Sequence, residues 1–262
     1  MRLTVLGSGS AWSTVGGNAC YCLDGRILID CGSPAHLLLP RAGINVQDID
    51  VVLLTHFHAD HTFMLPLFLG GRGLGDRTPR PLQLAGPPGT REYVLRVLRT
   101  GYGQLLHDLV IHNLGLQTTI LQDGSDVSIG DHRVRANAVV HSTGPSLSYA
   151  ITGPDGATVG FSGDSTLCAG LRRTAAASQL MVCECTDFDA PVGSHLWRGE
   201  IETLIDEHPS TTFLLSHLSE RRSLDGALIA HDLLSLDVNP PGTAPPQPPE
   251  AMARATSGAP SG

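Results

Sequence analysis

Short apolar runs separated by turn residues set the pattern of much of the chain. Runs of this kind that are rich in Val, Ile, Leu and Phe predict strands. Asp24-Gly25 lies between two of them and predicts a hairpin turn. The predicted strands are residues 3–6, 19–23, 26–30, 50–55, several strands within 118–140 with turns at Asp123-Gly124 and Gly130-Asp131, and residues 148–151, 158–161, 180–185 and 211–216.

Helical patterns occur between these strands, at residues 34–42, 62–69, 90–99 and 199–208. The Gly-rich run 70–80 predicts a loop. This loop could be a flexible connector, which we favour, or could contact phosphate through Arg72 or Arg77. The sequence does not assign a structure to residues 101–113, which could fold over a nearby pocket. Strands and helices in this order predict an α/β fold, a sandwich of two sheets with helices outside.

The last part of the chain differs in composition from the rest. Within residues 239–262, seven positions are Pro and most of the others are Gly, Ala, Ser or Thr. Such a segment cannot bury enough apolar surface to offset the entropy lost on ordering. We therefore expect one folded domain over residues 1–238, followed by a Pro-rich disordered tail.

Four potential metal ligands lie within six residues, directly after the apolar run 50–55. They are His56, His58, Asp60 and His61. The end of a buried strand is rigid enough to hold ligands and open enough to admit a substrate. Imidazole and carboxylate groups together suit zinc, and also iron or manganese. A polar loop with chance histidines is the alternative, which we disfavour because further ligands follow downstream.

Those further ligands also follow strand-like runs. His141 follows the run 134–140, Asp164 follows 157–162 and His217 follows 211–216. Strand ends that converge on one edge of a sheet would bring these side chains into one pocket. Seven ligands are too many for one tetrahedral zinc ion, which takes four. They suit two metal ions ~3.5–4 Å apart that share a carboxylate and a water.

The order His-x-His-x-Asp-His, then a distant His, an Asp and a final His, resembles the metallo-β-lactamase fold. Other segments are similar to its ribonuclease Z-like branch, which contains phosphodiesterases. They are Leu6-Gly7-Ser8-Gly9-Ser10, residues 26–32, residues 85–90 and residues 161–166. The resemblance covers roughly residues 1–220 and implies a four-layer αββα sandwich and a metal-dependent hydrolase. The six-residue motif is specific for the fold and much less specific for the substrate.

The resemblance also assigns roles to the candidate ligands. It implies that His56, His58 and His141 bind a first divalent ion and that Asp60, His61 and His217 bind a second. Asp164 would bridge the two ions, which we expect to be zinc, with manganese or iron as alternatives. A bridging hydroxide would then attack the substrate, and Asp60 would orient it.

His195 is the second catalytic candidate. In ribonuclease Z-like enzymes a histidine in this region protonates the leaving oxygen, and imidazole titrates in the right range for that task. The usual His-Ser-Thr of that branch reads His195-Leu196-Trp197 here. An ordinary surface or capping histidine is the alternative. Glu184 either supports this site by a hydrogen bond or is merely solvated.

Charge and loop lengths narrow the substrate. The chain has 17 basic residues, all Arg, and 25 acidic residues, for a net charge of −8, which disfavours broad contact with nucleic acid. Transfer-RNA-processing relatives carry a long arm between the later ligands, whereas the segment between His141 and Asp164 holds one hairpin. We therefore expect a small or nucleotide phosphodiester and disfavour RNA. The alternatives are lactone or thioester hydrolysis on the same metal site, and a non-catalytic module that binds a small molecule.

The remaining features set the expected environment. The six cysteines lack zinc-finger spacing, so buried reduced thiols are expected. The sequence shows no secretory signal and no apolar run of the ~20 residues that a membrane span needs. We expect a cytoplasmic protein without membrane contact, and a homodimer is consistent with the family.

Overall fold

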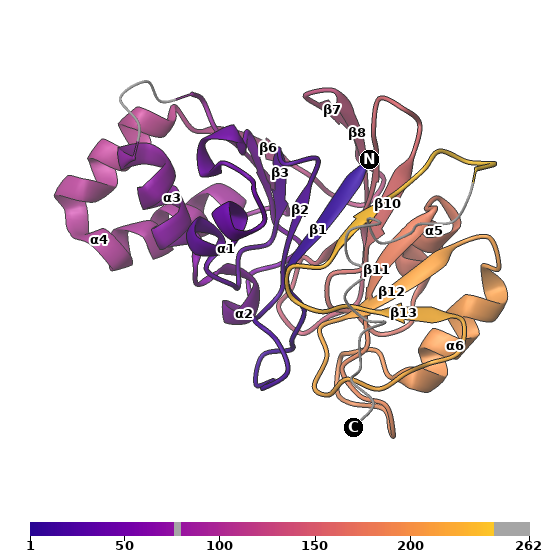
Figure 1. Ribbon diagram of the computed structural model, residues 1–262. Coiled ribbons are helices and arrows are strands. Elements are labelled where there is room, and N and C mark those ends of the chain that lie inside the picture. The colour runs from indigo at the N-terminus through magenta and orange to yellow at the C-terminus, as the bar shows by residue number, and fades with distance from the viewer. Residues whose placement is uncertain (76–79, 244–262) are drawn as a thin grey trace, which may run out of the picture.

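The structure is a computed structural model that describes residues 1–75 and 80–243. Two seven-stranded mixed sheets form its centre (Figure 1). The first has the strand order β14-β1-β2-β3-β4-β5-β6 and the second the order β13-β12-β11-β10-β9-β8-β7. The strands of the first sheet are β1 Arg2–Gly7, β2 Cys20–Leu23, β3 Ile27–Ile29, β4 Val51–Leu53, β5 Gln83–Gly86, β6 Gln117–Ile120 and β14 Ser235–Asp237. Those of the second are β7 Asp126–Ile129, β8 His132–Ala138, β9 Leu147–Thr152, β10 Thr158–Phe161, β11 Leu180–Glu184, β12 Thr212–Ser216 and β13 Ala227–Ile229.

Helices cover the outer face of each sheet, which gives the four-layer αββα arrangement predicted from the sequence. Figure 1 shows α1, α3 and α4 beside the first sheet and α5 and α6 beside the second. The helices are α1 Ala35–Arg41, the 3-10 turn η1 Val46–Asp48, α2 Ala59–Thr62, α3 Leu65–Leu74, α4 Thr90–Leu114, α5 Ala169–Ala176 and α6 Arg198–Glu207. None of the described helices is long and apolar enough to cross a membrane.

The apolar runs seen in the sequence arise because the central strands are buried on both faces. Along β4, Val51 and Leu53 point into the core between the sheets, whereas Val52 points toward the helices of the first sheet. Along β11, Val182 points into the same central core and Met181 packs toward α5 and α6. Strands that are covered on both sides lose the alternation of polar and apolar residues and become continuously apolar.

Each sheet is antiparallel at one end and parallel at the other. β3, β4, β5 and β6 pair in parallel, as do β10, β11, β12 and β13. The parallel strands end at the same edge, where functional side chains can gather. Two hydrogen bonds join the sheets near this edge, from Tyr149 Oη to the Leu54 carbonyl at 2.7 Å and from the Leu147 amide to the Thr55 carbonyl at 3.0 Å.

The structure corrects several details of the sequence-based prediction. The helix expected at 90–99 continues to Leu114 across a kink at Gly103, whose φ of +67° lies in the left-handed region. Residues 101–113 therefore belong to α4 and pack on α3 rather than over the site. The turn predicted at Asp123-Gly124 is present, and it connects β6 of the first sheet to β7 of the second. The strands β5, β13 and β14 and the helix α5 were not anticipated.

The expectations for the loop at 70–80 and for the Pro-rich tail meet the structure only in part. The loop expected at 70–80 begins inside α3, and Arg72 is buried there. Its guanidinium donates to the Ile49 carbonyl at 3.1 Å and to Gln47 Oε1 at 3.0 Å, so a phosphate contact through Arg72 is wrong. Arg77, and the part of the predicted tail from residue 244 on, lie outside the described residues.

All six cysteines are free, and all but Cys168 are buried, as expected.

Candidate dinuclear metal site

The six-residue motif lies on the segment that follows β4. His56 and His58 lie on the loop, whereas Asp60 and His61 belong to the first turn of α2. The Thr62 hydroxyl donates to the His58 carbonyl at 2.7 Å and fastens the loop to this short helix. The sequence placed all four ligands on a loop, and the helix turns two of them toward the opposite sheet.

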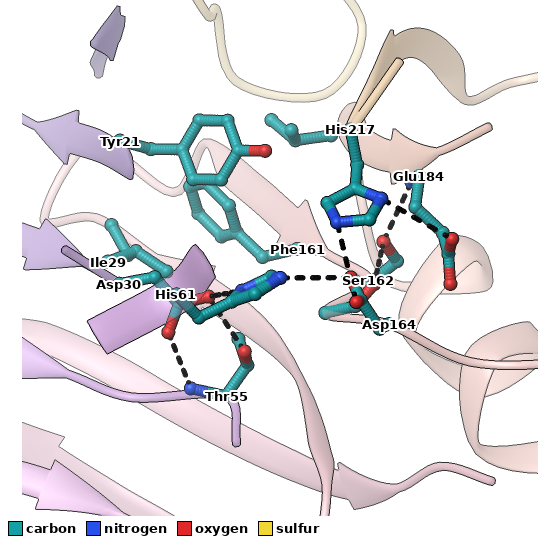
Figure 2. Close-up of a pocket in the computed structure, with 12 residues that line it drawn as sticks. Tyr21, Ile29, Asp30, Thr55, His61, Phe161, Ser162, Asp164, Glu184 and His217 are labelled. Atoms are coloured by element: carbon teal, nitrogen blue, oxygen red, sulfur yellow. Dashed lines mark hydrogen bonds and ion pairs between the residues drawn. The ribbon is translucent and has the colours of Figure 1, made fainter. Parts of the chain in front are cut away.

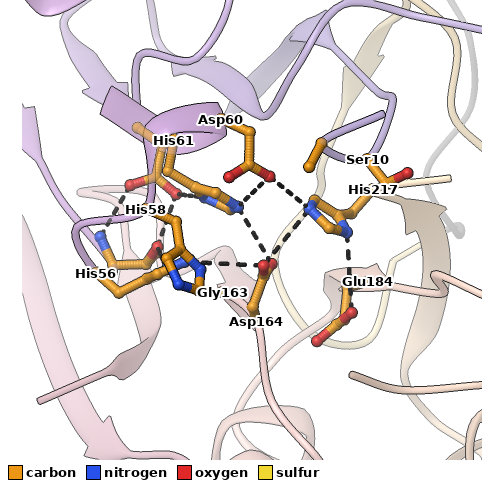
Figure 3. Close-up of polar contacts among 12 residues, drawn as sticks. Ser10, His56, His58, Asp60, His61, Gly163, Asp164, Glu184 and His217 are labelled. Atoms are coloured by element: carbon orange, nitrogen blue, oxygen red, sulfur yellow. Dashed lines mark hydrogen bonds and ion pairs between the residues drawn. The ribbon is translucent and has the colours of Figure 1, made fainter. Parts of the chain in front are cut away.

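The three distant candidates come from the second sheet and point at the motif. His141 lies just beyond β8, Asp164 just beyond β10, and His217 directly follows β12. The structure thus brings together all seven side chains that the sequence singled out as ligands, as Figure 3 shows for six of them. His217 has a φ of +54°, a conformation that non-glycine residues rarely adopt and that often marks a functional position.

The first group of candidate ligands contains three imidazoles and one carboxylate. His141 Nε2 lies 2.9 Å from His58 Nδ1 and 3.8 Å from Asp164 Oδ2. His56 Nε2 lies 3.7 Å from the same carboxylate oxygen. Ligands ~2.0–2.1 Å from a tetrahedral ion stand about 3.4 Å from one another, so the group has the spacing of one metal site.

The second group contains two imidazoles and two carboxylates, with Asp164 shared. His217 Nε2 lies 3.1 Å from Asp60 Oδ2 and 3.4 Å from Asp164 Oδ2. His61 Nε2 lies 3.2 Å from Asp164 Oδ1 and 3.6 Å from Asp60 Oδ2. Asp164 therefore presents oxygen atoms to both groups, as a bridging ligand must (Figure 3).

Unpartnered buried atoms show that this donor set fits metal ions. Among the described residues, His56 Nε2, His61 Nε2 and both carboxylate oxygens of Asp164 are buried without a hydrogen bond. Buried polar atoms of this kind are costly unless something binds them. All four point into the two groups, where divalent cations would bind them.

The charges of the site also favour cations. Burial opposes ionisation of Asp60, but its hydrogen bond with His217 and the nearby His61 outweigh burial and lower its pKa to about 2. Burial likewise opposes ionisation of Asp164, and the surrounding imidazoles lower its pKa well below the usual range. Burial disfavours a charge on His61, yet Asp164 and Asp30 raise its pKa. The site therefore holds ionised carboxylates that attract positive charge.

A buried hydrogen-bond relay orients the ligands of the motif. Asp30, directly after β3, accepts from the Thr55 amide at 2.9 Å, from the Thr55 hydroxyl at 2.7 Å and from His61 Nδ1 at 2.7 Å. Because the Thr55 hydroxyl donates to Asp30, it accepts from His56 Nδ1 at 3.0 Å. Both imidazoles then present Nε2 to the two groups of candidate ligands, called the metal groups below, as in metal sites whose outer partners fix the tautomer. Figure 2 shows this arrangement for Asp30, Thr55 and His61.

A second relay of the same kind lies on the opposite sheet. Thr186 donates to Glu184 Oε2 at 2.8 Å and accepts from His217 Nδ1 at 2.9 Å. Glu184 also accepts from His195 Nδ1 at 3.0 Å and, through its other oxygen, from the Ser165 amide. His195 thus lies beside the metal groups rather than on the outer surface, and Glu184 is buried and hydrogen-bonded rather than solvated.

Burial disfavours a charge on His195, but the hydrogen bond to Glu184 and the charges of Glu184 and Asp164 outweigh burial and raise its pKa. Its Nδ1 lies 3.6 Å from Asp164 Oδ2, and its side chain lines the open cleft above the metal groups. His195 therefore combines access to the cleft with a partner that fixes its orientation. The relay residues Asp30, Thr55 and Thr186 escaped the sequence-based prediction, although Asp30 ends a predicted strand as the ligands do.

Space around the metal groups is open on one side only. On the inner side, a cavity of about 10 Å³ between the sheets is lined by residues that include Tyr21, Phe161, Asp30, Thr55 and Glu184 (Figure 2). Its size is about what one water molecule needs. On the outer side, a cleft of about 500 Å³ is lined by residues that include His58, Asp60 and His195. A substrate must approach the metal groups through this outer cleft.

The fold and the site define a metallo-β-lactamase fold hydrolase related to ribonuclease Z, with a His/Asp cluster typical of dinuclear metal sites. The family model described as Anti-Pycsar protein Apyc1 matches residues 1–227. The chain therefore belongs to the Anti-Pycsar Apyc1 family.

Individual relatives agree with the fold and with the relation to ribonuclease Z. Ribonuclease Z of Methanosarcina acetivorans is 23% identical over 91% of this chain and 98% of its own length. The structure is similar to the crystal structure of human tRNase Z, short form, with a TM-score of 0.73 and 20% identity, covering 91% of this chain and 99% of that one. It is also similar to the metallo-β-lactamase fold protein YhfI of Bacillus subtilis, with a TM-score of 0.71 and 17% identity, covering 89% and 98%.

Proposed function

We propose that the protein is a dinuclear metal-dependent phosphodiesterase. The observation that supports it most is the convergence of two ligand groups on Asp164, whose buried oxygens have no hydrogen-bond partner among the described residues. A first ion would be held by His56, His58 and His141 and a second by Asp60, His61 and His217, with Asp164 shared. Zinc is the metal we expect, because imidazole and carboxylate ligands suit it, with manganese and iron as alternatives.

When bound, two divalent ions would supply Lewis acidity and acidify a water molecule between them. The chain provides the positioning groups. Asp60 lines the cleft and is partly exposed, so its carboxylate can accept a hydrogen bond from the attacking water. The two relays keep the ligand imidazoles in the tautomer that leaves Nε2 free for a cation.

His195 is the proposed general acid. Its Nδ1 is engaged by Glu184, which leaves Nε2 as the nitrogen that can give a proton to the leaving oxygen. The buried carboxylate of Glu184 stabilises the protonated imidazole and fixes the ring. Glu184 is a positioning residue in this scheme, because it acts through His195.

The proposed substrate is a small or nucleotide phosphodiester rather than a long RNA. The segment between His141 and Asp164 contains only the hairpin β9–β10 and leaves no room for a long substrate-binding arm. The net charge of −8 opposes contact with an extended polyanion. The cleft of about 500 Å³ lies within the range of small-molecule sites.

The proposal is tested with zinc- or manganese-loaded protein on bis(p-nitrophenyl) phosphate, with an aryl ester and a lactone in parallel. We expect diester turnover that Asp60→Ala abolishes, because this change removes a proposed ligand that also orients water. Asp24→Asn, in the turn at the opposite end of β3 from Asp30, is the control and keeps its turnover. Ester or lactone turnover without diester turnover would move the protein to carbonyl hydrolysis, and metal binding without any turnover would favour a binding module.

A further inference from the structure

We propose that Trp12 and Phe63 form an aromatic platform that stacks on the base of a nucleotide substrate while its phosphodiester lies at the metal groups. The inference rests on the proposed phosphodiesterase function and names the residues that would hold the base of a nucleotide substrate. The two aromatic side chains line the outer cleft together with Asp60, Asp164 and His195, so one ligand in this cleft can contact the rings and the proposed metal site.

Trp12 stands at the tip of a turn that is fastened to the site. The Ser13 amide donates to the Ser10 carbonyl at 3.1 Å and closes the turn, and Asn18 Nδ2 donates to the same carbonyl at 2.9 Å. The Ser10 amide in turn donates to the carbonyl of Leu218, the neighbour of the proposed ligand His217, at 3.0 Å. These bonds hold the backbone of the turn beside the proposed ligand His217, and the Trp12 side chain that the turn carries is 95% exposed.

Phe63 is placed by the metal motif itself. It caps α2 directly after His61 and Thr62, and its amide donates to the Ala59 carbonyl at 2.9 Å. Its ring is 61% exposed. A Trp and a Phe that leave this much apolar surface in water add little to the core, and exposed aromatic surface at the mouth of a cleft is typical of ligand sites.

The lining of the cleft selects the kind of ligand. The lining contains acidic and imidazole groups of the proposed metal site, which would take one phosphate through its cations. It also contains the uncharged residues Trp12, Phe63, Met64, Ala11 and Asn18, and no Arg is among the described residues that line this cleft. A second phosphate has no cationic partner there, whereas a neutral flat base can stack on the rings, as every base has a π face.

The test compares wild type with Trp12→Ala and Trp12→Phe, using Leu105→Ala as the matched control because Leu105 is 83% exposed on α4. The substrates are 3′,5′-cyclic AMP, 3′,5′-cyclic CMP and the base-free 3′,5′-cyclic phosphate of methyl riboside. We expect Trp12→Ala to raise KM for both nucleotides by about 5- to 150-fold, the range of base–aromatic stacking. It should leave KM for the base-free diester unchanged, and Trp12→Phe should recover most of the loss.

Binding gives a readout that does not depend on turnover. In a Trp197→Phe background, where Trp12 is the only tryptophan, a slowly hydrolysed phosphorothioate analogue of cyclic AMP should quench the fluorescence, and the base-free diester should not. Turnover of the cyclic nucleotides with equal KM in wild type and Trp12→Ala, and no quenching, would overturn the platform and leave the phosphodiesterase intact. Absence of turnover on every diester, base-free included, would overturn both.

Discussion

Asp30 controls the orientation of two proposed ligands, His56 and His61, without being a proposed ligand itself. Its two carboxylate oxygens serve three donors, the Thr55 amide, the Thr55 hydroxyl and His61 Nδ1. The substitution Asp30→Asn keeps the volume of the side chain. It also suits the backbone, since Asp30 has a φ of +54° and Asn tolerates the left-handed region.

The side-chain amide introduced by Asp30→Asn offers one acceptor oxygen where the carboxylate offered two. If that oxygen stays on the Thr55 amide, the NH₂ group meets the Thr55 hydroxyl and His61 Nδ1, which both donate in the wild type. The direction of these hydrogen bonds then reverses, and His61 Nδ1 becomes an acceptor. His61 carries its proton on Nε2 instead, where a metal ion would bind. A reversed relay of this kind lowers metal affinity by about 10- to 100-fold. If the relay keeps its direction instead, one buried donor is left unsatisfied and the free energy of unfolding falls by ~1–3 kcal/mol.

The assay is a competition for Zn²⁺ between metal-free protein and a chelating dye, with chemical unfolding of the metal-free protein beside it. Asp24→Asn is a close control. Asp24 also has a positive φ, of +52°, and its carboxylate also accepts from a backbone amide, that of Arg2, and from an imidazole, that of His132. Unchanged zinc affinity in Asp30→Asn, or an equal loss in Asp24→Asn, would refute the reasoning.

Three further predictions follow from individual contacts. A Cβ on Gly32 would lie 1.7 Å from the Asp60 carbonyl oxygen, so Gly32→Ala should displace α2, weaken zinc binding in the dye assay and cost ~1–3 kcal/mol in unfolding; unaltered zinc binding would contradict this. Arg72→Met should lower the free energy of unfolding by ~1–3 kcal/mol and leave KM for a diester unchanged. A raised KM would show that Arg72 does contact the phosphate of the substrate. Burial opposes ionisation of Asp24, but its hydrogen bonds with His132 and Arg2 outweigh burial and lower its pKa. A lowered pKa contributes stability above the ordinary value of about 3.9, so the stability advantage of wild type over Asp24→Asn should be full at pH 6 and shrink as the pH falls through that value and below; a difference that grows toward acid pH would show the sign to be wrong.

The candidate ligands could be located from the sequence because each lies close to the end of an apolar run. A buried strand can be recognised from its apolar composition, and the residues that end parallel strands lie together at one edge of the sheet. His56, Asp164 and His217 all follow this rule. The relays could not be found in this way, because the pairing of Asp30 with Thr55 depends on the side-by-side register of β3 and β4.

The glycines of residues 70–75 led to the prediction of a loop, whereas in the structure they allow two helices to pack closely. Residues 70–75 read as a loop, yet Gly70 and Gly73 lie in α3 where it crosses α4. A Cβ on Gly70 would lie 2.3 Å from Tyr102 Oη, and one on Gly73 would lie 3.2 Å from Val110. The same glycines that lower helix propensity permit the helices to approach, and tertiary contact outweighs local preference here.

The most direct test of the dinuclear site is electron paramagnetic resonance of protein loaded with Mn²⁺, combined with the metal content per chain. The two ligand groups share Asp164, so we expect two Mn²⁺ ions per chain and the spectrum of an exchange-coupled pair. Asp164→Ala should lose the coupling. One ion per chain, or two ions with the spectrum of isolated Mn²⁺ in the wild type, would contradict a centre bridged by Asp164.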